Sequence, residues 1–444
     1  MISRIVALLA ALVLATACTP AADTTTTTLT TTVPSEPVTS APTSTAESTT
    51  TTTAPVATTL PVGTESLPIE MRQEIAELIV LTEHIRGLTF LQPPTIIVVS
   101  AEELEQRVRD SIEEEIETLP ADEALLELLG LIDAETDLLG LYLDLYGEQV
   151  AGSYDGETGE LVIPAGEMLS ALQKGTLVHE LTHALTDQRF GFMDRYGALL
   201  DGDLFDEAVA LLAVAEGDAM LTEVQYIQQL SFGEQQEFLA EAIGRDSPVF
   251  DAAPAYLQNS LLFPYQEGLA FVQRAYEIGG HDEVNRLYVE PPVSSEQIIN
   301  PRAYGEDMPI PVEIVEPAVA GYDVVYESVW GQLSFQLMFD QVLGGASDAV
   351  DGWGGDSYIQ WFDGENAAFL LAYAGDAAAD HQEMADALTR YAQTAMDVEQ
   401  TEDTGAGAVF EGEDFAFVRV TGDRVFFVAA SDPAVGRRIV AALP

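Results

Sequence analysis

Two of the chain's five histidines, His179 and His183, are four residues apart in a stretch whose other residues are mostly apolar. The pattern predicts a helix over residues 169–189, and on a helix residues four apart share one face. A helix this apolar is expected to be buried, and buried histidines together with the adjacent Glu180 then need polar partners. The chain must therefore bring other polar side chains to this helix when it folds.

The same spacing predicts a metal site. Two imidazoles on one helix face can hold one zinc ion, and Glu180 beside it can take a proton from water and pass it to a leaving amine. The chain has a single cysteine, Cys18, which excludes an intramolecular disulfide and a multi-thiolate site. Any transition-metal site must use His, Asp and Glu, and we predict Zn²⁺ at His179 and His183.

Catalytic zinc needs a third protein ligand and one open position. Glu216 follows the wholly apolar run 208–215, where a buried carboxylate is costly unless it is paired or bound to metal. Gly217 and Ala219 are expected to let the histidine-bearing helix approach closely. The other reading places Glu216 in a turn facing solvent. The alternative ligands on the same segment are Glu207, Asp218 and Glu223.

The segment His179–His183, followed by Glu216-Gly217-Asp218-Ala219, resembles the gluzincin arrangement of thermolysin-like metallopeptidases. The longer motif His-Glu-x-x-His-Ala-Leu-x-Asp-Gln is similar to a largely uncharacterised family of bacterial proteins. The family's further motifs are Gly-x-Tyr-Asp, Pro-Tyr-x-x-Gly and Ser-x-Glu-Gln-Ile, here at Gly152–Asp155, Pro264–Gly268 and Ser294–Ile298. The resemblance covers about residues 96–304 and, more faintly, 352–358. It implies a zincin-like fold, zinc at His179, His183 and Glu216, and Glu180 as the catalyst.

One position departs from the thermolysin-like pattern. Met220 stands where an aspartate that orients a histidine is frequent, four residues after the glutamate. Asp187 is a candidate for that orienting role, and a surface salt bridge to Arg189 or a neighbouring residue is the equal alternative. Tyr265 and Tyr154 are the candidates for donating a hydrogen bond to the oxyanion of a tetrahedral intermediate, and Tyr265 is preferred.

The amino terminus predicts export. Arg4 precedes the short apolar stretch 5–17, and Ala15-Thr16-Ala17-Cys18 resembles the lipobox of bacterial lipoproteins. We expect residues 1–18 to be a lipoprotein signal, with a lipidated Cys18 holding the protein on the outer side of the cell membrane. An ordinary cleaved signal peptide is the alternative. Residues 19–65, rich in Thr and Pro, are predicted to be a disordered linker.

The charge balance argues against nucleic acid as a partner. The chain has 74 acidic and 17 basic residues, a formal net charge of −57. Binding to nucleic acid depends on basic side chains that neutralise phosphates, and this surface would repel them. The predicted partners are instead a peptide or protein substrate and the membrane.

The expected fold class is α+β in two domains. Residues 66–308 are predicted to form a mainly helical, zincin-like domain with a small sheet, and residues 309–444 a smaller α+β domain with an antiparallel sheet. The elements predicted from the sequence are helices at 69–88, 101–119, 121–146, 169–189, 205–230, 233–243, 267–278, 324–343, 377–396 and 434–442, a strand at 95–99, a hairpin within 149–163, an irregular loop at 290–302, a glycine loop at 352–356, a strand at 369–373 and a hairpin at 415–429.

Together these features predict a surface-anchored zinc metallopeptidase. The alternative is a catalytically inactive lipoprotein that keeps the zincin fold as a binding or assembly module. A structural zinc, which four protein ligands usually close, is a third reading, although the sequence offers only three ligands.

Overall fold

The computed structural model describes residues 60–100, 102–104, 106–107, 118–149, 152–156, 158–164, 168–244, 246–345, 347–396, 398–404 and 407–444. The predicted signal peptide, Cys18 and the linker up to residue 59 lie outside these residues. Val62 forms a parallel bridge with Thr95, and Thr64 is buried, so the chain joins the fold before residue 66. No helix in the described part of the chain is both long and apolar enough to span a membrane.

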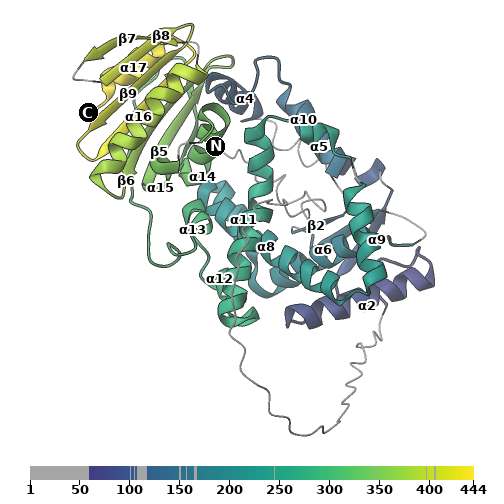
Figure 1. The fold of residues 1–444 in the computed structure, drawn as a ribbon. Coiled ribbons are helices and arrows are strands. Elements are labelled where there is room, and N and C mark those ends of the chain that lie inside the picture. The colour runs from purple at the N-terminus through teal and green to yellow at the C-terminus, as the bar shows by residue number, and fades with distance from the viewer. Residues whose placement is uncertain are drawn as a thin grey trace, which may run out of the picture.

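The fold is α+β, as predicted. Figure 1 shows a helical region beside a region built on a large sheet. The helical region contains α2 (Ile69–Arg86), β1 (Thr95–Val99), α4 (Leu119–Leu128), α5 (Leu138–Gln149), β2 (Ser153–Asp155), β3 (Glu160–Pro164), α6 (Ala171–Phe190), α7 (Phe192–Asp201), α8 (Phe205–Gln229), α9 (Phe232–Ile243), α10 (Pro248–Ala252), α11 (Ala255–Gly279), α12 (His281–Val289) and α13 (Ser295–Ile299). The sheet region contains β4 (Asp323–Ser328), α14 (Gly331–Leu343), α15 (Ser347–Asp351), β5 (Trp353–Phe362), β6 (Ala367–Gly375), α16 (Ala378–Ala395), β7 (Val398–Thr404), β8 (Gly407–Gly412), β9 (Phe415–Thr421), β10 (Arg424–Ala430) and α17 (Pro433–Ala442).

A three-stranded sheet packs against helix α6. Its strand order is β1-β3-β2; β1 runs parallel to β3, and β2 pairs antiparallel with β3, which confirms the predicted hairpin. Leu161 and Ile163 of β3 are buried together with Val178 and Leu181 of α6. Strand β2 is therefore an edge strand that runs beside the helix carrying both histidines.

Helix α6 begins and ends where its local sequence dictates. Ser170 caps the first turn by accepting a hydrogen bond from the Gln173 N–H, and the Gln173 side chain accepts one from the Ser170 N–H. The helix stops at Gly191, whose φ of 63° is a left-handed conformation that glycine adopts without steric cost. These signals place His179 and His183 near the middle of the helix, where the backbone is most regular.

Helix α8 is the central helix of the helical region, because nearly every side chain from Phe205 to Glu223 is buried. It packs against α6 on one side and α11 on another. A Cβ at Gly217 would lie 2.2 Å from the carbonyl oxygen of Gly268 in α11. Gly217 therefore admits α11, and the prediction that it admits the histidine-bearing helix is wrong.

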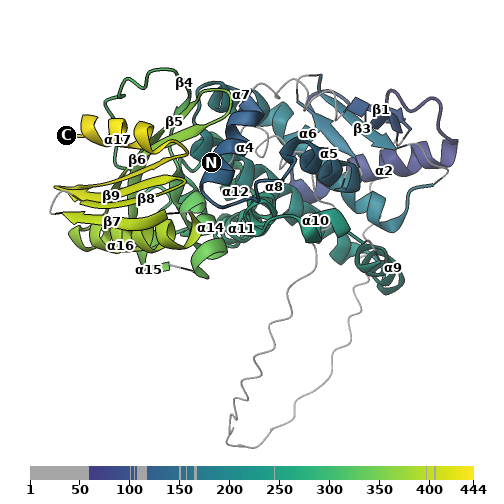
Figure 2. The same cartoon turned by 90° about the horizontal axis from the view of Figure 1, so that it is seen from above.

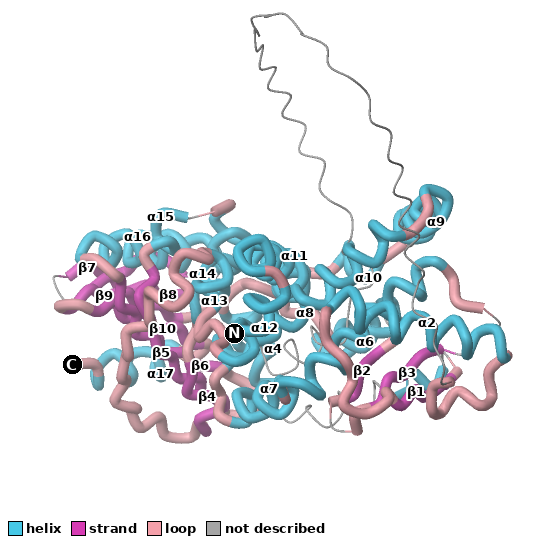
Figure 3. The backbone as a smooth tube through the Cα atoms, turned by 90° about the horizontal axis from the view of Figure 1, so that it is seen from below, coloured by secondary structure: helices cyan, strands magenta, loops and turns pink. Residues whose placement is uncertain are grey.

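The seven-stranded sheet is antiparallel throughout, in the order β4-β5-β6-β10-β9-β8-β7. Figures 2 and 3 show α16 on one face and α17 on the other. The burial alternates accordingly: Ile359 and Trp361 of β5 pack with α17, whereas Tyr358 faces the core shared with α14 and α16. That shared core continues into α8 and α11 without a break.

Two predicted elements in the sheet region are wrong. Residues 324–343 form β4 followed by α14, because Val324 and Tyr326 pair with β5 and the left-handed Gly331, at φ 78°, then starts the helix. Residues 352–356 do not form a glycine loop, since β5 begins at Trp353. The glycines there let the backbone at Ile310 pack directly against β5. The Ile310 N–H donates to the Gly354 carbonyl at 2.6 Å, and a Cβ at Gly355 would lie 2.3 Å from the Ile310 carbonyl oxygen.

Predictions in the helical region need correction as well, and the first is the helix expected at residues 267–278, which is the second half of α11 and begins at Ala255. The single helix expected at residues 121–146 is two helices, α4 and α5, separated near Gly130, which has a φ of 66°. The irregular loop expected at residues 290–302 contains the short helix α13, where the Ser294 hydroxyl accepts a hydrogen bond from the Gln297 N–H. The last correction matters because α13 positions Glu296.

Candidate metal centre

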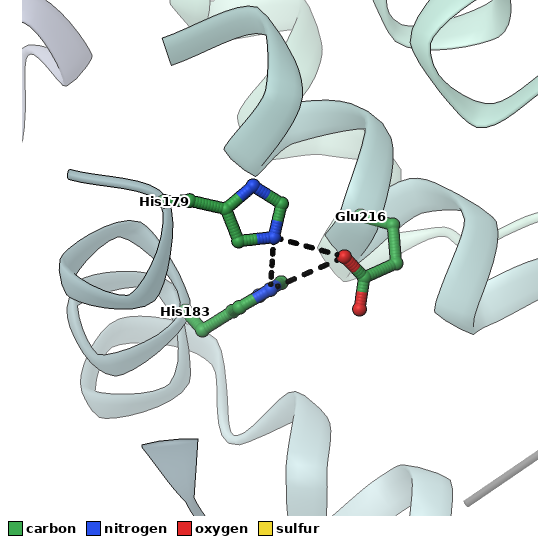
Figure 4. A group of neighbouring side chains, drawn as sticks. All are labelled: His179, His183 and Glu216. Carbon is green, nitrogen blue, oxygen red and sulfur yellow. Dashed lines mark hydrogen bonds and ion pairs between the residues drawn. The ribbon is translucent and has the colours of Figure 1, made fainter. Parts of the chain in front are cut away.

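Three side chains from two helices converge in the helical region. The Nε2 atoms of His179 and His183 lie 3.0 Å apart, and Glu216 Oε2 lies 3.0 Å from the first and 3.4 Å from the second. Figure 4 shows both imidazole rings on α6 directed at the carboxylate that α8 presents. These three residues form a group that could bind a metal ion.

The donor set suits a tetrahedral metal. Zinc holds nitrogen and oxygen ligands at about 2.0–2.2 Å, so ligands at neighbouring tetrahedral corners stand about 3.3 Å apart. The three separations lie close to that value, and the atoms converge from three directions. In addition, two imidazole nitrogens face each other, an arrangement in which only one of them can carry a hydrogen toward the other. The residues therefore fit a zinc ion.

The ligand group is nearly covered by protein. His179 and His183 are 7% and 5% exposed, and Glu216 is 1% exposed. Burial alone would raise the pKa of Glu216, but the two histidines beside it bring that pKa below its usual range. Burial alone would lower the pKa of His179, but Glu216 and Glu223 raise it. Without metal, the site thus favours a protonated His179 beside an ionised Glu216, and the proton supplies the positive charge that a metal ion would otherwise supply.

Glu180 lies between this group and the edge strand β2. Burial raises the pKa of its carboxyl, while His179, His183 and a hydrogen bond from the Tyr154 backbone N–H oppose that shift. A cavity of about 10 Å³, room for one water molecule, is lined by Glu180, Gly152 and Thr176 among others. The general base predicted from the sequence thus has a water-sized space at its side.

Glu223, predicted only as an alternative ligand, lies beside the His179 ring nitrogen that faces away from the metal centre. Glu223 Oε2 lies 3.7 Å from His179 Nδ1, on the opposite side of the ring from Glu216. Glu223 is 2% exposed, and a Cβ at Gly175 would lie 2.8 Å from its other carboxylate oxygen. Gly175 therefore makes room on α6 for a group that orients a histidine of the site.

Comparison with known proteins reaches only the sheet region. Residues 320–440 match DUF8575, a domain of unknown function. No curated protein and no solved structure matches the chain. The matched range begins after α13, so every residue of the metal centre lies outside it. The interpretation of the centre therefore depends on its own geometry.

Asp187 takes neither of the two roles predicted for it. Its carboxylate accepts hydrogen bonds from the Tyr154 hydroxyl at 2.8 Å and from the Met193 backbone N–H at 2.9 Å. Arg189 donates instead to the Thr89 carbonyl. Asp187 thus fixes the β2–β3 hairpin and the start of α7 against α6, and the Tyr154 hydroxyl is committed to that contact.

Two tyrosines lie near the metal centre. The ring of Tyr265 in α11 stacks on the His179 ring, with centroids 6.2 Å apart, and its side chain is buried. The hydroxyl of Tyr196 in α7 is buried without a hydrogen-bond partner among the described residues, and burial together with Glu216 raises its pKa. Tyr196 could not be predicted as a neighbour of the site, because no helix was expected at residues 192–201.

The remaining alternative ligands lie elsewhere on α8. Asp218 is fully buried and paired with Arg86, whose Nε lies 2.8 Å from one of its oxygens. Glu207, in the first turn, has Arg195 as its attractive charged neighbour. Among the described residues only Glu216 joins both histidines in a metal-binding group.

Proposed function

We propose that the chain is a zinc metallopeptidase. The observation that carries the proposal is the convergence of His179 Nε2, His183 Nε2 and Glu216 Oε2 at separations of 3.0–3.4 Å, with Glu180 next to His179 on the same helix. Three protein ligands leave one position open, as in catalytic rather than structural zinc sites.

Each residue then has a defined task. His179, His183 and Glu216 would hold the ion, and Glu223 would keep the His179 ring turned toward it. Zinc, when bound, would supply Lewis acidity that makes hydrolysis possible at neutral pH. The Glu180 carboxylate would take a proton from the attacking water and deliver it to the nitrogen of the departing amine, which breaks the C–N bond. Tyr265 is the candidate donor to the oxyanion.

The edge strand β2 offers a place for an extended peptide. It pairs with β3 on one side only within the described sheet, and it contacts α6 beside Glu180. A peptide added antiparallel or parallel to a free strand edge gains main-chain hydrogen bonds without a requirement for particular side chains. Such a peptide would lie beside Glu180, whose carboxylate accepts a hydrogen bond from the Tyr154 N–H of this strand.

Metal analysis combined with peptide cleavage tests this proposal. Wild-type protein should contain about one zinc ion per chain and should cleave members of a peptide library. Glu180→Gln should keep the zinc and lose activity by about 10²-fold or more, because it removes the base without removing a ligand. Glu237→Gln is the matched control, since Glu237 is an exposed acid on α9 and its substitution should change neither property. Unchanged cleavage by Glu180→Gln would contradict the assigned role.

The near-complete burial of the ligands favours a second candidate function. With Glu216 only 1% exposed, the centre could hold zinc without admitting a peptide and serve a binding or assembly module. Zinc content of about one per chain with no cleavage of any library member would select this function. Absence of zinc from protein prepared with the metal present would reject both candidates.

We further propose that the protein is exported and anchored to the cell membrane through a lipidated Cys18. The support is the sequence Ala15-Thr16-Ala17-Cys18 after a short apolar segment, with Cys18 as the chain's only cysteine. Mass spectrometry of the mature amino terminus should find a diacylated cysteine as the first residue. Cleavage elsewhere, with an unmodified or missing Cys18, would contradict it.

A further inference from the structure

A second group of acidic side chains gathers far from the histidines in the sequence, where the helical region meets the sheet region. Glu296 comes from α13, Asp307 from the segment after α13, and Asp376 from the turn between β6 and α16. One carboxylate oxygen of each lies within 4.8 Å of the others. Three chain segments that meet at one point thus each contribute a negative charge.

Glu296 makes this group different from an ordinary acidic surface. The residue is only 5% exposed, yet its carboxylate has no hydrogen-bond donor and no cation as a partner among the described residues. Its charged neighbours are Asp307, Asp376 and Asp206, all carboxylates. A buried carboxylate in that setting is costly to keep without a compensating positive charge.

The backbone around the group holds the three segments in place. The Gln297 side-chain amide donates to the Asp307 carbonyl at 2.6 Å and accepts from the Val293 N–H at 2.9 Å. The Asp376 N–H donates to the Gly352 carbonyl at 3.2 Å. Gly354 leaves space for the third carboxylate, because a Cβ there would lie 2.8 Å from Asp376 Oδ1. The convergence is therefore built by the fold rather than by free side chains.

We propose that Glu296, Asp307 and Asp376 bind a calcium ion that ties α13 and the segment after it to the β6–α16 turn. The donors are all carboxylate oxygens, which hard cations prefer. Calcium accepts six to eight oxygen ligands at about 2.3–2.6 Å in flexible geometry, whereas magnesium demands a near-ideal octahedron, so carboxylates from three separate segments suit calcium better. Asp307 and Asp376 are exposed, so water can supply the remaining ligands.

The cation also explains the electrostatics of Glu296. Burial and the neighbouring carboxylates raise the pKa of Glu296 to about 7. Without a cation, the Glu296 carboxyl therefore either holds a proton or is repelled by the carboxylates around it. A divalent ion would replace the proton and convert three repulsive contacts into three attractive ones. The ion would thus stabilise the joint between the two regions, a role separate from the proposed hydrolysis.

Thermal unfolding of the full chain with calcium tests the proposal. In protein dialysed against metal-free buffer, 10 mM CaCl₂ should raise the wild-type Tm by about 3 °C or more, and 10 mM MgCl₂ should raise it less. Asp307→Asn and Asp376→Asn, at exposed positions where folding is not at risk, should each weaken calcium binding by about tenfold or more in a calorimetric titration. Glu296→Gln should abolish the calcium response and raise the calcium-free Tm.

Two control variants separate this site from other effects. Glu313→Gln removes the same charge from an exposed position on the same connecting segment and should leave the calcium response intact. His183→Ala should also leave it intact, since that residue belongs to the other centre. A calcium response that is absent in wild type, matched by magnesium, retained in all three acidic variants or lost in His183→Ala would overturn the proposal.

Discussion

Helix α8 carries two buried carboxylates two residues apart, and their partners differ in kind. Asp218 faces Arg86, whose Nε lies 2.8 and 2.9 Å from its two oxygens, and the Tyr288 hydroxyl donates to it at 2.9 Å. Among the described residues, the hydrogen-bond and ion-pair partners of Glu216 Oε2 are the two histidines. An arginine stays charged at any physiological pH, whereas a histidine can release its proton and bind a metal through the freed nitrogen. The Asp218–Arg86 pair therefore cannot bind a metal ion, whereas Glu216 and the two histidines can.

The difference shows how to separate a structural buried acid from a functional one. Burial is nearly the same for both, since Glu216 is 1% and Asp218 0% exposed. The charge of Asp218 is balanced within the protein by a group that cannot leave. The charge of Glu216 is balanced only while a histidine holds a proton, so a metal ion can take over that role.

The largest expected effect on stability is that of Asp218→Asn. The substitution leaves the Arg86 guanidinium, which is 0% exposed, without its counter-ion, and breaking a buried ion pair in this way costs about 3–5 kcal/mol. Denaturant unfolding should measure that loss, while zinc content of the folded fraction should stay near one per chain. Asp194→Asn, at an exposed acid on α7, is the control and should change neither. If the folded variant lost its zinc, the two carboxylates would not be independent.

For Glu216→Gln we expect a large loss of zinc affinity and a smaller loss of stability. Removal of one of three ligands should lower zinc affinity at least hundredfold, about 3 kcal/mol, in competition with a metal indicator. The metal-free variant should lose less stability than Asp218→Asn, because His179 and His183 can release a proton when their counter-ion is removed. A zinc affinity equal to wild type would move the third ligand away from Glu216.

The histidine helix and Glu216 could be predicted because their signals are local. The spacing of His179 and His183 and the apolar run before Glu216 specify one helix face each, and α6 and α8 begin and end within two residues of the predicted bounds. The element at residues 324–343 failed because a short apolar run fits either a strand or a helix. Its strand forms through pairing with β5, a contact that the local sequence does not encode.

The roles of the other acids on α8 depended on how the helices cross. Glu216 and Glu223 are seven residues apart and share a helix face, whereas Asp218 points elsewhere, so helical periodicity was a usable signal for Glu223. It could not tell that Glu223 reaches the rear nitrogen of His179 while Glu216 reaches the front one. The position of Glu223 depends on Gly175, because the missing side chain there lets the Glu223 carboxylate approach α6.

Glu223→Gln should therefore produce an intermediate effect. Loss of the carboxylate behind His179 should lower zinc affinity by about 10-fold to 100-fold, as removal of a ligand's outer partner typically does, and should leave the metal in place at saturating zinc. Glu223→Asp, which keeps the charge at a longer distance, should fall between wild type and Glu223→Gln. If Glu223→Gln lowered zinc affinity as far as Glu216→Gln does, Glu223 would be a ligand rather than an orienting residue.

The smallest expected effect concerns Asp206, another buried acid of α8, which has neither an arginine nor a histidine as a partner among the described residues. Asp206 accepts a hydrogen bond from the Ser295 N–H at 3.1 Å, and burial raises its pKa to about 7. An unfolded chain titrates this group near pH 3.9, so the folded protein binds the proton more tightly. The stability that Asp206 contributes is thus complete below about pH 4 and is lost as the pH rises through about 7.

Asp206→Asn should remove that pH dependence. In calcium-free buffer, the free energy of unfolding of wild type should fall relative to the variant by about 1 kcal/mol between about pH 5 and pH 6, where the folded state holds one more proton. Glu237→Gln serves as the control for general repulsion in so acidic a protein, and should follow the wild-type slope. Parallel pH profiles for wild type and Asp206→Asn would mean that Asp206 stays ionised in the fold. Asp218, Glu216 and Asp206 would then no longer divide into one neutralised by arginine, one by histidine or metal, and one by a proton.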